Sequence, residues 1–349
     1  MTDATAPTPD ERLIATSLAS RLIARPDIGA FLAALAVFGL FAAFAHDAGW
    51  IGWADAAQWT DQSAQYGIVA VPVALLMIGG EFDLSAGVMI GSSGLLLGLL
   101  GTRAHLDIWP SILLVLLFGA AVGLINGITV VKTRLPSFIV TLGTFFILQG
   151  VNAAGTLKIT GTVAIENIDS TPGFESAYRL FSSTVWSPYD FKVKVIWWIA
   201  ITAVGAWVLA RTRFGNWIYA VGGDPVAARN VGVPVVRTKI VLFVLTSTTS
   251  ALLGVIEALE LRSTQANEGV GREFIFIIAA VVGGCLLTGG YGSVVGTAFG
   301  SAILGMASIG IILAGWDSNW TFTFLGTILV LAVLMNAAFR ARAARARVR

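Results

Sequence analysis

The feature that most constrains this chain is a series of long apolar runs that recur from residue 28 to residue 338. Several of them reach the roughly 18 to 20 residues that an α-helix needs to cross a bilayer. A backbone in lipid must satisfy its own hydrogen bonds, so only helices and closed barrels can span a membrane. These runs are too long and too uniformly apolar for barrel strands, which alternate in polarity. The sequence therefore predicts an all-α polytopic membrane protein.

The composition agrees with a membrane protein. Of the 349 residues, 56% are hydrophobic and only 12% are charged, and the mean hydropathy is +0.82. A soluble protein of this size needs more charge to cover its surface. We predict about ten transmembrane helices, and the predicted spans are 28–45, 63–80, 86–102, 110–131, 137–153, 193–210, 240–260, 273–288, 293–313 and 320–338.

The basic residues predict how the spans are oriented. With the N-terminus inside, 15 of the 22 Lys and Arg residues fall in segments on the inner side. Loops that stay in the cytoplasm carry such an excess, so both termini are predicted to be cytoplasmic. The predicted organisation is a cytoplasmic tail (1–27), a transmembrane domain (28–338) and a basic cytoplasmic tail (339–349). Only two connections are long, an outer loop at 154–192 and a cytoplasmic loop at 211–239.

The sequence offers little for an enzyme. No lysine follows a glycine, so the chain lacks the Gly-Lys pair that the phosphate-binding loop of an ATPase requires. Two histidines and a single cysteine cannot be assembled into a Ser/His/Asp or Cys/His nucleophile set. We expect no catalytic residues, no metal, no cofactor and no nucleic-acid partner. Transport is the expected role of ten spans without a soluble domain.

The stretch GGEFDLSAG places two carboxylates, Glu81 and Asp83, inside a long segment without Lys or Arg. The apolar runs on either side are each only about 18 residues long, so this break is expected near the inner face. Asp83 or Ser85 can cap the span that follows. Glu81 is left without such a role, and an ionised carboxylate at membrane depth usually pairs or lines water. It is predicted to bond either an inner arginine or a substrate hydroxyl.

A second group of polar residues lies on the fourth and fifth predicted spans. Asn126 is on the fourth span, and Thr141, Thr144, Gln149 and Asn152 fall on one side of the fifth at 100° per residue. Uncharged hydrogen-bonding side chains suit a neutral polyol that passes between helices. The alternative is that they bond neighbouring helices, as polar side chains in membranes often do. We take them, with the three polar residues of GGEFDLSAG, as the candidate substrate pathway.

The cytoplasmic loop contains a short helix with clear start and stop signals. Asp224 can cap its N-terminus, Pro225 suits the first helical position, and Gly232 can adopt the left-handed conformation that ends it. A helix this short is marginal in water and needs a partner surface. It either docks another protein or lies as an elbow on the inner ends of the spans. The candidate docking residues are Asp224, Pro225, Val226, Ala227, Ala228, Arg229, Asn230, Val231 and Gly232.

Small residues mark the ninth predicted span and the segment before it. Gly292, Gly296 and Gly300 are spaced four apart, which lets two helices approach closely in lipid. We expect this row to pack within the bundle, and a seam between two chains is the alternative. The preceding stretch 283–292 contains five glycines, which predicts a bent or re-entrant backbone that is buried in protein or faces water.

Several stretches, in the same order, resemble the permease subunits of bacterial ATP-binding-cassette (ABC) importers of the ribose/xylose/arabinose type. They run from about residue 65 to residue 336 and include GGEFDLSAG, NGITVVKTRLPSFIVTLGT, RTRFGNWIYAVGGDPVAARNVGV, IIAAVVGGCLLTGGYGSVVGT and LAVLMN. In that family two permease chains form the pore, separate ATPase subunits dock beneath, and a periplasmic binding protein delivers the sugar from above. The resemblance therefore implies an ABC-importer permease fold in the bacterial inner membrane.

The resemblance also matches the short loop helix to the coupling helix of the family, on which the ATPase acts. The wider importer motif is E-A-A-x-x-x-G. Ala227, Ala228 and Gly232 fit its spacing, but Val226 stands where the motif has Glu. Arg229 is the remaining charge on the helix.

We therefore hypothesise that the chain is the permease subunit of an ABC importer for a monosaccharide, meaning a pentose, a hexose or a related polyol. Its expected partners are an ABC ATPase, a periplasmic sugar-binding protein, a second permease chain in a homodimer, and membrane lipid. One alternative is a permease of a branched-chain amino-acid or nucleoside ABC importer. Another is an ion-coupled secondary transporter, in which Glu81, Asp83, Glu257 and Glu260 would be the coupling groups. A membrane enzyme is a remote third alternative.

Overall fold

The computed structural model describes residues 26–46 and 49–346, and these residues are predominantly helical. Eight helices within them are long and apolar enough to cross a membrane, which confirms the predicted all-α polytopic class. The eight are α2 (Pro26–Phe44), α3 (Trp53–Ile78), α4 (Ser85–Thr102), α5 (Ile108–Thr133), α6 (Ser137–Thr160), α8 (Val193–Arg211), α11 (Val235–Leu261) and α13 (Val294–Leu313).

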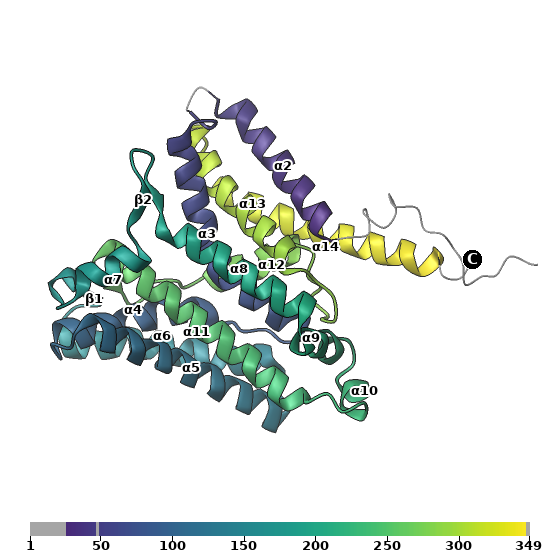
Figure 1. Ribbon diagram of the computed structural model, residues 1–349, viewed down its shortest axis with the longest axis horizontal. Coiled ribbons are helices and arrows are strands. Elements are labelled where there is room, and N and C mark those ends of the chain that lie inside the picture. Colours follow the sequence, from purple (N-terminus) through teal and green to yellow (C-terminus); the bar gives the residue numbers. More distant parts are fainter. Residues whose placement is uncertain (1–25, 47–48, 347–349) are drawn as a thin grey trace, which may run out of the picture.

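The remaining helices lie at the two ends of the bundle or occupy the eighth and tenth predicted spans. α12 (Arg272–Val282) and α14 (Trp320–Ala346) occupy the other two predicted spans. Figure 1 shows α7 (Phe174–Phe181) at one end of the bundle, and α9 (Arg213–Gly223) and α10 (Pro225–Asn230) at the opposite end. We call these the α7 end and the α10 end. The predicted orientation makes the α10 end cytoplasmic, because the predicted inner loop forms α9 and α10.

The α7 end carries a small cap of short elements. Two two-stranded antiparallel pairs are present in the described residues, β1 with β4 and β2 with β3. The pairing of β1 with β4 joins the connection after α6 to the end of α11. The elements of the cap, besides α7, are β1 (Ala164–Ile165), the 3-10 helix η2 (Ile168–Ser170), β2 (Thr184–Trp186), β3 (Phe191–Lys192) and β4 (Thr264–Gln265).

The core of the bundle is formed by α3, α4, α11 and α13. Between 61% and 83% of the apolar window of each of these helices is buried, against 17% for α2 and α8. α11 and α5 form the most extensive helix–helix contact. Small residues on α5 let the two backbones approach closely. A Cβ atom added at Gly123 would lie 2.7 Å from the Cα atom of Val244, and one at Gly127 would lie 2.9 Å from that of Ile240. These two glycines belong to a row, Gly119 to Gly127, at a spacing of four.

The glycine row of the ninth predicted span faces the chain's own α12 segment. A Cβ atom added at Gly296 would overlap the carbonyl oxygen of Gly283, and one at Gly300 would overlap that of Ala279. Gly292 precedes α13 and lies against the end of α3. Within this chain, therefore, α13 and the α12 segment pack backbone against backbone.

Two predicted spans differ in length from the helices that form. α3 begins at Trp53 instead of 63, and Asp61 in the added turns pairs with Lys194 of α8. α12 ends at Val282, although the predicted span continued to 288. Gly283 and Gly284 follow it, and Gly284 has a φ of +92°, a conformation that stops an α-helix. The structure thus has a helix of 11 residues, about 16 Å long at 1.5 Å per residue.

The predicted tails and loops also change at their edges. α14 continues to Ala346, through most of the predicted tail 339–349, because its alanines and arginines are strong helix formers. α6 extends to Thr160, so the long outer connection begins after it and not at 154. Of the predicted tail 1–27, residues 1–25 lie outside the described residues.

A reporter fusion tests the orientation. Reporters fused after Arg349 and inserted between Gly173 and Phe174 should differ, because these sites lie at opposite ends in the predicted orientation. We expect a reporter that requires the cytosol to be active only after Arg349, and one that requires export to be active only at the α7 end. Export of the C-terminal fusion would contradict the orientation derived from the basic residues.

Candidate functional site

The connection between α3 and α4 is pinned to α11 by an ion pair. Glu81 is 7% exposed and its carboxylate pairs with the ammonium group of Lys239 in the second turn of α11. The sequence predicted an inner arginine or a substrate hydroxyl as the partner of Glu81, and the structure instead supplies a lysine of the predicted inner loop. An ionised pair in this position satisfies both charges near the membrane boundary.

Asp83 is the centre of a buried hydrogen-bond network. Its Oδ1 atom accepts from the backbone N–H of Ser85 (2.9 Å) and from the Ser85 hydroxyl (2.5 Å). Its Oδ2 atom accepts from the hydroxyl of Ser247 on α11 (3.4 Å). Asp83 therefore satisfies the first N–H group of α4. The N-cap position itself is Leu84, which makes no side-chain cap, so the prediction that Asp83 or Ser85 occupies the cap was wrong.

The network continues through two more helices. Asn126 on α5 donates from Nδ2 to the Ser85 hydroxyl (3.0 Å), and its Oδ1 accepts from the Thr144 hydroxyl on α6 (2.6 Å). Asn126 and Ser85 have no exposed surface. The structure thus brings three of the predicted pathway residues together and bonds them to one another across α4, α5 and α6.

Side chains of α6 also satisfy the backbone of the break. The hydroxyl of Ser137 accepts from the N–H of Phe82 (3.0 Å), and the hydroxyl of Thr141 accepts from the N–H of Leu84 (3.0 Å). An irregular backbone at membrane depth needs such partners. Thr141 was predicted as a pathway residue, whereas Ser137 was not, because its role depends on a contact with a segment 55 residues away.

The other two polar residues of α6 lie farther toward the α7 end. Asn152 is buried and donates from Nδ2 to the carbonyl oxygen of Ala266 (3.5 Å), in the connection after β4. Gln149 is half-buried. The predicted polar side of α6 is therefore divided between the break after α3 and the cap beside β4.

A second charged cluster ties four helices together near the α7 end. Lys194 of α8 is only 4% exposed at its side chain, and its ammonium group lies 2.9 Å from Asp61 of α3 and 2.7 Å from Glu260 of α11. One turn away, Arg272 at the start of α12 pairs with Glu257 of α11 at 2.5 Å. The sequence analysis did not assign these pairs. Lys194, at the start of an apolar span, could have indicated them, because a buried ammonium group requires carboxylate partners.

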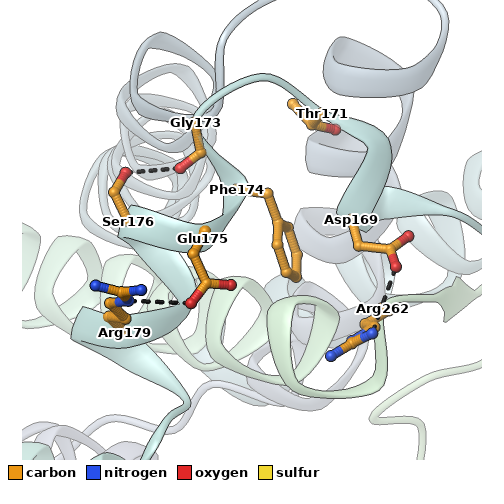
Figure 2. A pocket seen from close by; sticks show the side chains of 8 residues that line it. All are labelled: Asp169, Thr171, Gly173, Phe174, Glu175, Ser176, Arg179 and Arg262. Carbon is orange, nitrogen blue, oxygen red and sulfur yellow. Dashed lines mark hydrogen bonds and ion pairs between the residues drawn. The ribbon is translucent and has the colours of Figure 1, made fainter.

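The surface of the α7 end carries a hollow of about 870 Å³ between η2, α7 and the end of α11. Figure 2 shows Phe174 in its wall with an ion pair on either side. Arg179 pairs with Glu175 (3.0 Å) and Arg262 with Asp169 (3.5 Å). Both arginine side chains are more than half exposed, so they are accessible to a partner that approaches this end.

The structure forms the short helix of the predicted cytoplasmic loop as α10. The Oδ1 atom of Asp224 accepts from the N–H groups of Val226 (2.9 Å) and Ala227 (3.0 Å), and Pro225 occupies the first turn. Gly232 follows the helix with a φ of +84°. Asp224 therefore caps the N-terminus as predicted, and Gly232 adopts the predicted left-handed conformation. The helix itself ends at Asn230, and Val231 is its C-cap.

α10 presents an apolar and basic surface at its end of the bundle. Ala228 is buried against the protein, whereas Val226 is 69% exposed and Val231 is 79% exposed. A groove of about 470 Å³ runs between α10 and the first turns of α11. Six apolar residues line it together with Arg229 and Arg237.

Comparison with known proteins places the chain among membrane transport components. Residues 56–334 match the family described as "Branched-chain amino acid transport system / permease component". The chain is 32% identical over 277 residues to the ribose import permease protein RbsC of Escherichia coli strain K12, which covers 79% of this chain and 83% of that protein. It is 31% identical over 278 residues to the inner membrane ABC transporter permease protein YjfF of the same strain, with coverages of 78% and 81%. No solved structure matches the chain.

A third relative comes from another bacterium. The chain is 31% identical over 287 residues to the fructose import permease protein FrcC of Rhizobium meliloti, which covers 81% of this chain and 78% of that protein. In all three comparisons the matched part is more than three quarters of both chains.

A double-mutant cycle tests the ion pair between Glu81 and Lys239. Glu81→Gln or Lys239→Gln alone leaves the other charge without its partner, and each should lower the free energy of unfolding by roughly 1 to 3 kcal/mol, because the pair is partly exposed. The double variant should lose less than the sum of the two single losses. The free energy of unfolding is measured by denaturant titration in detergent micelles.

The exposed pair between Arg179 and Glu175 serves as the control. Arg179→Gln should leave the stability within about 0.5 kcal/mol of the wild type, as expected for a pair at the surface. Strictly additive losses at Glu81 and Lys239 would show that the two groups do not interact.

Proposed function

This chain belongs to the family of branched-chain amino acid transport system permease components, and we propose that it is the membrane subunit of an ABC importer for a monosaccharide. The observation that carries this function is the similarity along more than three quarters of the chain to permeases named for the import of ribose and of fructose. The family description mentions amino acids, but these relatives import sugars, which favours a sugar. The multi-pass structure and an inner membrane relative agree with a place in the inner membrane.

In this proposal a separate ATPase supplies the energy. The sequence has no Gly-Lys pair for a phosphate-binding loop, so the chain must depend on a partner for ATP hydrolysis. α10 is the surface that we assign to this partner. Its exposed Val226 and Val231 and the adjacent Arg229 offer apolar and basic contacts to a protein in the cytoplasm.

A periplasmic binding protein delivers the sugar to the α7 end. The hollow beside Phe174 supports this assignment, because Arg179 and Arg262 present accessible charges on its rim. Charged groups on a rim favour rapid and specific encounter with a complementary surface. Two copies of the chain complete the pore in this proposal, and lipid surrounds them.

The polar network around Asp83 supports a role for the break in α3 and α4 as part of the transport machinery. It joins the Asp83 carboxylate to residues of α4, α5, α6 and α11 in the irregular connection between α3 and α4. Glu81, Asp83, Ser85, Asn126, Thr141, Thr144, Gln149 and Asn152 remain our proposed pathway residues. They either contact the sugar when the helices separate or hold the helices in register before that movement.

The charges favour ATP-driven transport over the ion-coupled alternative. Three of the four candidate coupling groups are in ion pairs: Glu81 with Lys239, Glu257 with Arg272, and Glu260 with Lys194. The fourth, Asp83, accepts hydrogen bonds from Ser85 and Ser247. A carboxylate that binds a coupling ion must be free to exchange it, and a fixed basic partner competes with that exchange.

Reconstitution tests the proposed function. The purified chain alone should hydrolyse no ATP, whereas vesicles containing the chain, its ATPase and its binding protein should accumulate a monosaccharide only when ATP is present. Uptake of radiolabelled ribose, fructose and leucine is measured in parallel. Uptake that continues without the ATPase would contradict the proposal, and uptake of leucine in preference to both sugars would assign the chain to the amino-acid branch.

Variants in α10 test the docking surface. Arg229→Glu reverses its only basic charge, and Gly232→Val places a β-branched residue where φ is positive, which such residues resist. Both variants should insert into the membrane and should lose at least about 90% of uptake, or roughly 1.4 kcal/mol of coupling. Uptake and the amount of ATPase that co-purifies are measured.

Arg229→Lys is the matched control, since it keeps the charge and should retain most of the uptake. A cysteine at position 229 should also cross-link to the ATPase, and the native Cys285 is buried and does not compete. If Arg229→Glu and Gly232→Val both transport normally and no cross-link forms, α10 is not the docking surface and only connects α9 to α11.

A further inference from the structure

Three pairs of adjacent glycines from three separate segments meet at the α10 end. Gly79–Gly80 follows α3, Gly222–Gly223 ends α9, and Gly289–Gly290 lies in the loop between α12 and α13. The N–H of Gly290 donates to the carbonyl oxygen of Ile78 (2.8 Å), which ties this loop to the end of α3. We call the meeting point the glycine junction.

Gly222 lies at the centre of the glycine junction. A Cβ atom added there would overlap the carbonyl oxygen of Ile78 and would lie 2.6 Å from the nitrogen of Gly290. A Cβ atom added at Gly289 would lie 2.8 Å from the Cα atom of Gly80 and 2.9 Å from the oxygen of Gly222. The three backbones therefore touch without an intervening layer of side chains. Side chains can absorb a small displacement by changing rotamer, but touching backbones must move together.

The glycine junction stands between α10 and the candidate pathway. On one side, Asp224 follows the glycine pair of α9 directly and caps α10. On the other side, Gly80 precedes Glu81, the residue that binds the α3–α4 connection to α11. A third contact runs from the hydroxyl of Tyr219 on α9 to the carbonyl oxygen of Gly292 (2.9 Å), just before α13.

We infer that Gly222 is a positioning residue for transport, the contact through which movement of α10 reaches both the α3–α4 connection and the α12–α13 loop. The inference rests on the proposed docking of the ATPase to α10 and adds the path inside the permease. When the ATPase displaces α10, the end of α9 moves with it. The α3–α4 connection and the α12–α13 loop then follow, because they touch Gly222 through their backbones. The break that carries Asp83 is thereby displaced as the nucleotide state changes.

Two adjacent glycines offer a matched pair of variants. A Cβ atom added at Gly222 meets the backbone of both neighbouring segments, whereas nothing lies within 4 Å of one added at Gly223. Both residues belong to the last turn of α9, so an alanine at either position brings a similar gain in helix propensity. Gly222→Ala and Gly223→Ala therefore differ mainly in their effect on the glycine junction.

The two variants are compared in vesicles that contain the ATPase and the binding protein. Gly222→Ala should assemble with the ATPase and keep its KM for ATP, but the ATP hydrolysed per sugar imported should rise about tenfold, a typical size for coupling between two sites. For Gly223→Ala, the ATP hydrolysed per sugar imported should stay within about twofold of the wild-type value. A wild-type ratio in Gly222→Ala would overturn the inference.

Hydrogen exchange on the wild-type complex gives a second test that does not depend on the folding of Gly222→Ala. Trapping the ATPase with ATP and vanadate should change the exchange of residues 222–232, and the exchange of 79–85 and 284–292 should change with it. A change confined to 222–232 would overturn the glycine junction as the path and leave the docking role of α10 intact. No change at 222–232 would overturn the docking role and this inference together.

Discussion

Every backbone N–H and C=O group at membrane depth must find a partner within the protein, and the architecture of this chain follows from that requirement. The helices satisfy it internally. The break after α3 satisfies it with side chains, because Ser137 and Thr141 of α6 accept from two of its N–H groups and Asp83 accepts from a third. The loop after α12 satisfies it in part through the end of α3, because the N–H of Gly290 donates to the carbonyl oxygen of Ile78 (2.8 Å). Irregular backbone therefore occurs in this bundle where neighbouring helices supply its partners.

The charged residues make α11 the common support of the bundle. At the α10 end, Lys239 binds Glu81 of the connection after α3. At the α7 end, Glu257 and Glu260 bind the basic residues Arg272 and Lys194 at the starts of α12 and α8. Between these ends, the contacts of α11 with α4 and α5 are mainly apolar and close. α11 is thus tied to its neighbours by ion pairs at both ends and by close packing along its middle.

Local features could be predicted from the sequence, whereas long-range partners could not. The apolar runs locate the spans, and Asp224 and Gly232 mark the ends of α10, because these signals act over a few residues. Glu81 was predicted to bond an inner arginine or a substrate hydroxyl, and its actual partner, Lys239, was missed because it lies 158 residues away along the chain. The glycines after α12 predicted an irregular backbone, but they could not show that it begins at Gly283 or that three glycine pairs meet. The pairing of Lys194 with α3 and α11 depends in the same way on how the helices assemble.

The short α12 has a consequence for the biosynthesis of the protein. A segment of 11 helical residues covers about half of the roughly 30 Å of hydrocarbon, and its irregular continuation exposes polar backbone until α13 packs against it. Such a segment gains little by leaving the translocon for lipid alone. α12 therefore depends on its packing against α13 for a stable place in the bilayer, so the two segments are expected to become stable there together. A ribosome that stalls between the two would leave an unfinished segment for membrane quality control.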